Sequence, residues 1–101
     1  MASLSSIGSS GLQAAQLRLD ASANNVANAD TPGYRRQAVA QQAVADSAGV
    51  RATVEREANE KGVALEQEAV EQMSATYAFK ARLQTIKTQA QMLGSLLDAK
   101  A

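Results

Sequence analysis

The sequence predicts a mainly α-helical chain, in which two long terminal helices pack as a hairpin or coiled coil and are joined by a short irregular or β-hairpin middle segment. Three observations support this fold class. Alanine, the strongest helix former, provides 22 of the 101 residues. Apolar residues recur at spacings of three and four near both ends of the chain. The single proline, Pro32, ends the first of these periodic segments.

The first predicted helix covers about residues 5–29. Its apolar or small residues are spaced like a coiled-coil seam, at Leu12, Ala15, Leu19, Ser22 and Val26. The helix must end before Pro32, because proline lacks an N–H group and restricts the residue before it. Thr31-Pro32-Gly33-Tyr34 has the proline and glycine positions of a type II turn. We therefore take residues 1–34 as an N-terminal helix and its turn.

The middle segment, residues 35–64, is harder to assign. Residues 38–48 are rich in alanine and glutamine, which favours a helix, but they carry no clear apolar stripe. Val50, Ala52 and Val54 alternate with polar residues, which is a strand pattern. We expect residues 59–62 to turn this strand back towards Val63 and Leu65 in a small hairpin. A short helix with Glu57 and Lys61 paired four residues apart is the alternative.

The third segment, residues 65–101, is predicted as a long helix that ends the same discontinuous domain. Its seam comprises Met73, Thr76, Phe79, Leu83, Ile86, Ala90, Leu93 and Leu97. Two helices with one seam each form a thin core, because alanine buries little apolar area. We therefore expect the helices to pack against copies of this chain or against another protein.

Composition argues against several functions. Basic and acidic residues balance at ten each, so no strong field attracts nucleic acid or an anionic membrane, and no apolar run is long enough to insert directly into a membrane. Cysteine and histidine are absent, which removes thiolate chemistry, the usual general base and the commonest metal ligand. We expect no catalytic residue, no cofactor and no metal site.

The polar residues near the end of the first helix have two interpretations. Asn24, Asn25 and Asn28 either cap a solvated helix end or hydrogen-bond a neighbouring chain. Arg35 and Arg36 after the turn are expected to be solvated charges. The glutamates at 66, 68 and 71 are expected to complement the dipole at the start of the last helix.

Residues 10–37 resemble the N-terminal signature of flagellar rod and hook proteins. In that family, a helix carrying Arg-Leu is followed by Ala-Asn-Asn-x-Ala-Asn-x-x-Thr-Pro-Gly-Tyr and a basic residue. The matching positions here are Asn24, Asn25, Asn28, Thr31, Pro32, Gly33, Tyr34 and Arg35. Residues 71–82 and 91–98 are similar to the closing helix of the proximal rod proteins, so the resemblance covers both ends of the chain.

The resemblance implies a structural subunit of the bacterial flagellar basal-body rod. Its partners would be copies of itself, other rod or axial proteins and the flagellar type III export apparatus, with export to the periplasmic rod and no cleaved signal peptide. Rod proteins usually carry a longer middle segment than this chain. That departure leaves open an alternative, namely a non-polymerising adaptor, chaperone or regulatory paralogue that binds axial proteins.

Overall fold

The computed structural model describes residues 4–45, 49–58 and 62–99. Within them, helix α1 spans Leu4–Ala27, strand β1 spans Gln37–Ala43, strand β2 spans Val50–Arg56 and helix α2 spans Leu65–Ala99. The predicted fold class, two long helices with a hairpin between them in the sequence, is confirmed.

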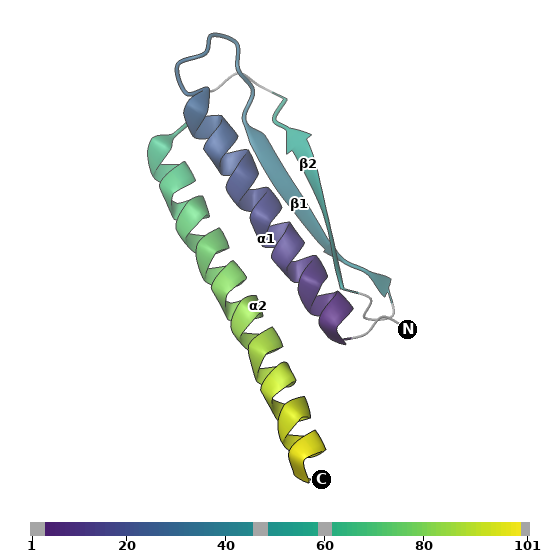
Figure 1. The fold of residues 1–101 in the computed structure, drawn as a ribbon. Coiled ribbons are helices and arrows are strands. Elements are labelled where there is room, and N and C mark those ends of the chain that lie inside the picture. Colours follow the sequence, from purple (N-terminus) through teal and green to yellow (C-terminus); the bar gives the residue numbers. More distant parts are fainter. Residues whose placement is uncertain (1–3, 46–48, 59–61, 100–101) are drawn as a thin grey trace.

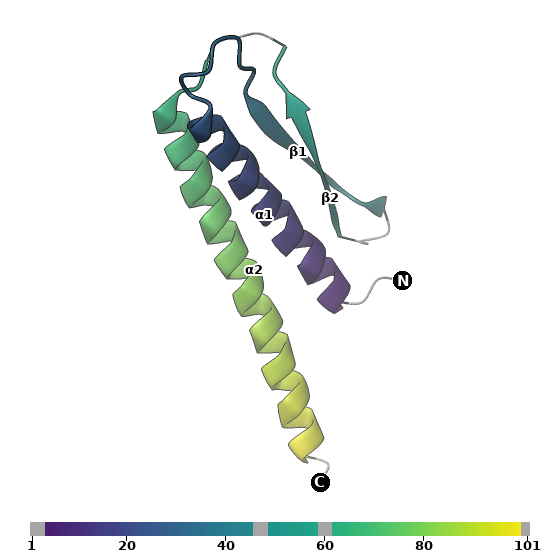
Figure 2. The same cartoon turned by 45° about the horizontal axis from the view of Figure 1, so that its top comes forward.

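The elements lie side by side, with α1 between α2 and the hairpin (Figure 1). The two helices are antiparallel, because the end of α1 lies beside the start of α2 (Figure 2). The molecule measures 64 × 26 × 14 Å, and its radius of gyration is 17.5 Å. A compact chain of about 100 residues has a radius of gyration of about 13 Å. The fold is therefore long and thin, and little of it is remote from solvent.

The turn after α1 has the predicted geometry. The Tyr34 backbone N–H donates to the Thr31 carbonyl oxygen at 3.2 Å. Gly33 has a φ angle of 73°, which the third position of a type II turn requires and which glycine adopts without a steric penalty. Thr31-Pro32-Gly33-Tyr34 therefore reverses the chain and directs it into β1.

The hairpin lies earlier in the chain than we predicted. Val50–Arg56 is a strand as expected, but its partner is Gln37–Ala43, with Val39 opposite Val54 in an antiparallel register. The helix favoured by the composition of residues 38–48 is thus replaced by β1 over its first part, because pairing with β2 overrides a weak local propensity. Val63 lies in no strand and Leu65 begins α2. The predicted turn and the alternative Glu57–Lys61 pair involve residues 59–61, which lie outside the described residues.

The two helices approach each other through small residues of α1. The α1 residues that face α2 follow a spacing of three and four, at Gly8, Gly11, Ala15, Arg18, Ser22 and Asn25. A side chain at Gly8 would press on Ile86, and one at Gly11 would collide with the guanidinium of Arg82. Within the described residues, the buried apolar side chains are all alanines, namely Ala14, Ala15, Ala21 and Ala75.

The predicted seam residues divide into two groups. Ala15 and Ser22 are buried, and the half-buried members are Leu12, Leu19, Phe79 and Ile86. The exposed members are Val26, Met73, Thr76, Leu83, Ala90, Leu93 and Leu97. At 1.5 Å per residue α2 is roughly 52 Å long and α1 roughly 36 Å, so the last turns of α2 extend beyond α1 (Figure 1). The exposed seam residues remain candidates for contacts between chains.

Two glycine substitutions should have opposite effects on stability. Gly49 has a φ angle of 110°, and a Cβ there would collide with the Ser10 hydroxyl, so Gly49→Ala should lower the free energy of unfolding by roughly 1–3 kcal/mol. Gly94 lies inside α2, and a Cβ added there would meet nothing within 4 Å, so Gly94→Ala should raise it by roughly 0.5–1 kcal/mol. Urea unfolding followed by circular dichroism measures both changes in the free energy of unfolding. If both variants change it in the same direction, the backbone conformations assigned to Gly49 and Gly94 are wrong.

Candidate functional site

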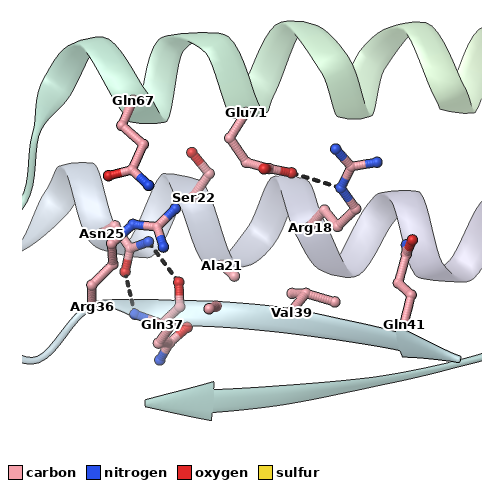
Figure 3. Close-up of a pocket in the computed structure, with 11 residues that line it drawn as sticks. Arg18, Ala21, Ser22, Asn25, Arg36, Gln37, Val39, Gln41, Gln67 and Glu71 are labelled. Carbon is pink, nitrogen blue, oxygen red and sulfur yellow. Dashed lines mark hydrogen bonds and ion pairs between the residues drawn. The ribbon is translucent and has the colours of Figure 1, made fainter. Parts of the chain in front are cut away.

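The most extensive polar arrangement among the described residues is centred on Asn25, in the last turns of α1. The Asn25 Nδ2 group donates to the Gln37 carbonyl oxygen at 2.9 Å, and the Gln37 N–H donates to Asn25 Oδ1 at 2.8 Å (Figure 3). Nδ2 also donates to Glu68 Oε1 at 2.7 Å, and the Tyr34 hydroxyl donates to Oδ1 at 2.9 Å. An amide offers two donors and two acceptor sites, so all four are used.

Glu68 brings a charge into this arrangement from the first turn of α2. Its side chain is fully buried, and the Arg36 guanidinium donates to it from Nε at 2.9 Å and from Nη2 at 3.3 Å. Arg36 also donates to Glu57 Oε1 at 3.2 Å. The forked guanidinium thereby neutralises the buried carboxylate, which satisfies the requirement for burying a charge.

We call Asn25, Tyr34, Arg36, Gln37 and Glu68 the polar lock. Burial lowers the pKa of Arg36, but hydrogen bonding and charge attraction to Glu68, supported by Glu57, outweigh this and raise that pKa above its ordinary value. A raised arginine pKa leaves the cation fully charged at every physiological pH. The stability that Arg36 contributes is therefore present below its ordinary pKa and is lost only in strong alkali.

The polar lock joins every element of the fold. Asn25 belongs to α1, Tyr34 to the turn, Gln37 to β1 and Glu68 to α2. Arg36 extends the contact to Glu57, the residue that directly follows β2. Among the described residues, the largest fully buried side chains are Glu68, Asn25 and Ser22. The buried apolar residues of the described chain are all alanines, which hold the elements together only weakly. The polar lock therefore determines how the hairpin and the two helices pack against one another.

The residues predicted to form an assembly motif are the eight positions that match the rod-family signature, and those other than Asn25 and Tyr34 lie at or near the surface around the end of α1. The Asn28 Nδ2 group donates to the Asn24 carbonyl oxygen at 2.9 Å and to Asn24 Oδ1 at 2.8 Å, and the Thr31 hydroxyl donates to Asn28 Oδ1 at 3.1 Å. These bonds close the helix end locally. The exposed members of the motif are Asn24, Thr31, Pro32, Gly33 and Arg35.

A cavity of about 370 Å³ lies beside the polar lock, between α2 and β1 (Figure 3). On its α1 side, Arg18 donates from Nε to Glu71 Oε1 at 2.6 Å and from Nη2 to Ser74 Oγ at 3.0 Å. The arginines that line the cavity are thus already paired with carboxylates. In the part of the chain that the structure describes, no group of acidic residues is arranged to hold a metal ion.

Comparison with known protein families gives a match for the segment that contains Asn25 and Tyr34. The family model for flagella basal body rod proteins matches residues 6–35, which cover most of α1 and the whole turn. The match confirms the resemblance to the flagellar rod family. A search of curated proteins found no match. The rod family is structural and not a family of enzymes, and the match shows that this chain resembles that family over α1 and the turn. Neither helix, over its described residues, is long and apolar enough to cross a membrane.

The partners within the polar lock were not predicted from the sequence. For Asn25 we weighed a helix cap and a contact with a neighbouring chain, whereas the side chain bonds four groups of its own chain. Arg36 and Glu68 were expected to be solvated and to complement a helix dipole, and they are instead an ion pair with side chains 10% and 0% exposed. One feature of the sequence could have indicated the contact between Asn25 and Glu68. Two long helices that pack as an antiparallel hairpin place the end of α1 opposite the start of α2.

Proposed function

We propose that this chain is a structural subunit of the bacterial flagellar basal-body rod, which assembles through the exposed faces of its terminal helices. In this proposal it reaches the periplasmic rod through the flagellar type III apparatus without signal cleavage. Its partners are copies of itself and other rod proteins. The exposed apolar surface of α2 is the observation that carries the proposal.

The first exposed face lies beyond the end of α1. On α2, Glu71, Arg82 and Ile86 lie against α1. The buried Ala75 falls at the same spacing of three and four, and this spacing continues to Leu93 and Leu96. Leu93 and Leu96 are 60% and 63% exposed, and their neighbours Met92 and Leu97 are equally open. A face built for helix packing thus continues where no described residue of α1 covers it, which supports contact with another chain.

The second exposed face lies near the start of α2, turned away from α1. Val70, Met73 and Tyr77 are between 66% and 77% exposed at spacings of three and four. Met73 and Tyr77 line a shallow groove of about 570 Å³ together with Ala69, Gln72, Thr76 and Lys80. Two separate apolar faces on one helix favour more than one neighbour, as a subunit in an extended assembly has.

The substitution Leu93→Asp should prevent incorporation into basal bodies while leaving the free chain folded. Leu93 is largely exposed in the single chain, so the aspartate costs little stability there, whereas a buried unpaired carboxylate in a helical interface costs several kcal/mol. The measurement is immunoblotting of purified basal bodies, with circular dichroism of the purified chain as the folding check. Thr88→Asp, on another face of the same helix, is the matched control and should incorporate.

The outcomes separate the two functional hypotheses. Normal incorporation of the Leu93→Asp chain would contradict assembly through this face. If the wild-type chain is absent from basal bodies but co-sediments with purified rod proteins as a discrete complex, the chain is the adaptor or regulatory paralogue. That alternative is favoured by the middle segment, whose described residues contain only the hairpin between the two helices.

A further inference from the structure

The hairpin leaves one row of backbone groups along β1 outside its own ladder of hydrogen bonds. The Glu57 N–H donates to the Arg36 carbonyl oxygen at 2.9 Å, and the Val44 N–H donates to that of Gly49 at 2.8 Å. Alternate residues of an antiparallel pair exchange hydrogen bonds, so these two bonds fix the phase of the ladder. Even-numbered residues of β1 bond to β2, and the N–H and C=O groups of residues 37, 39, 41 and 43 point away from it.

Near the two ends of the hairpin, outward backbone groups are hydrogen-bonded to side chains of α1. At Gln37 the Asn25 side chain occupies both outward groups, so its amide takes the place of a peptide unit from an adjacent strand. On the other edge, the outward N–H of Val50 donates to the Ser10 hydroxyl at 3.0 Å. Among the described residues, no hydrogen bond reaches the outward groups of Val39, Gln41 and Ala43.

The two edges of the hairpin differ in chemistry. The sequence of β2 carries three charged residues, Arg51, Glu55 and Arg56, which discourage a further strand from pairing there. The sequence of β1 is Gln-Ala-Val-Ala-Gln-Gln-Ala, without a charge or a proline. The cavity of about 370 Å³ lies directly beside it, with Val39 and Gln41 in its lining. The edge of β1 is thus open, unprotected and adjacent to free space.

We propose that this edge pairs with β1 of a second copy of the chain, antiparallel and about a two-fold axis at Gln41. The three open residues are evenly spaced around Gln41, so Val39 would lie opposite Ala43 of the second copy and Gln41 opposite its own equivalent. No like charges meet, since the strand has none, and the small alanine side chains keep the approach unobstructed. The pairing joins two hairpins into one four-stranded sheet.

This pairing goes beyond the proposed function and uses a different surface. A two-fold contact uses the same edge in both chains, so it closes at a dimer and does not propagate. It belongs to the free chain and protects an edge that would otherwise recruit unrelated strands. The apolar faces of α2 stay available in the dimer, so a failure of either proposal leaves the other standing.

A pair of proline substitutions at opposite positions of the hairpin tests the pairing. Gln41 and Ala52 face each other, and both outward N–H groups lie outside the ladder. In sedimentation equilibrium of the full chain, we expect a concentration-dependent dimer for wild type and Ala52→Pro. Gln41→Pro should raise the dissociation constant at least about tenfold, because it removes the central hydrogen bonds. A monomeric wild type, or equal effects of both prolines, would overturn the proposal.

A crosslinking experiment gives the same answer without a proline. The chain contains no cysteine, so a single introduced thiol reports one position. With a short bis-maleimide, Gln41→Cys should form a covalent dimer at micromolar concentration, because the two thiols lie opposite each other across the two-fold axis. Thr53→Cys, exposed on β2, should stay monomeric. Crosslinking that is equal at both positions, or absent at Gln41→Cys, would contradict the β1 pairing even if Gln41→Pro fails to fold.

Discussion

Replacement of Glu68 by alanine should lower the free energy of unfolding by about 3–5 kcal/mol. The substitution removes a fully buried carboxylate from Arg36, whose own side chain is only 10% exposed, and takes away one acceptor of the Asn25 amide. Removing one partner of a buried pair is costly because the other charge stays desolvated. Small domains are stable by only about 5–15 kcal/mol, so much of the variant should be unfolded at 37 °C.

Urea unfolding of the purified chain measures this loss. Glu66→Ala is the matched control, because Glu66 lies in the same first turn of α2 with its side chain exposed. It should change the free energy of unfolding by less than about 1 kcal/mol through the helix dipole alone. If Glu68→Ala and Glu66→Ala have equal effects, Glu68 has only the dipole role that its position in the sequence indicates.

The substitution Asn25→Asp should destabilise the chain at neutral pH by about 3 kcal/mol or more, although the two side chains have the same shape. A carboxylate has no hydrogen to donate to the Gln37 carbonyl oxygen or to Glu68, and it lies against the buried Glu68 charge. Repulsion raises the pKa of the introduced carboxyl in the folded chain. The loss should therefore be fully present at pH 7 and should shrink as the pH falls towards that pKa.

Unfolding curves at pH 7 and pH 4.5 check this prediction. Asn24→Asp is the control, since Asn24 is exposed and its Oδ1 only accepts a hydrogen bond, from Asn28. In that variant the free energy of unfolding should fall by less than about 1 kcal/mol, because a carboxylate near a helix C-terminus interacts unfavourably with the helix dipole. A pH-independent loss at Asn25→Asp would mean that the amide is not in contact with Glu68.

The helices were predictable because their signals are local. Alanine content and apolar spacing indicated both helices, and Pro32 and Gly33 indicated the turn between α1 and β1. The position of the hairpin was not predictable in this way, since β1 is rich in alanine and glutamine and is a strand through its pairing with β2 and with Asn25. These tertiary contacts of β1 outweighed the weak helix propensity of its sequence.

The packing face of α1 differs from the leucine seam for a related reason. Helix α1 lies between two layers, so it needs a second packing face for the hairpin. Towards α2 it presents Gly8, Gly11 and Ala15, which allow close approach, while Leu12 and Leu19 are only half-buried. Apolar spacing identifies the bulkiest stripe of a helix, and it does not show which neighbour that stripe meets.

The polar lock combines a recognisable motif with partners that the motif does not reveal. Asn25 and Tyr34 belong to the segment that matches the rod family, but Glu68 lies 43 residues away from Asn25 and Arg36 follows the matched residues. The structure gives these two motif residues a role inside their own chain. The exposed members of the motif, which are available to a neighbouring subunit, are Asn24, Thr31, Pro32, Gly33 and Arg35.

Deletion of the gene, followed by a motility assay and electron microscopy of basal bodies, tests the proposed rod function most directly. We predict non-motile cells whose basal bodies lack a complete rod, with motility restored by the wild-type gene and not by the Leu93→Asp form. Motile cells with complete rods after deletion would contradict a structural role in the rod.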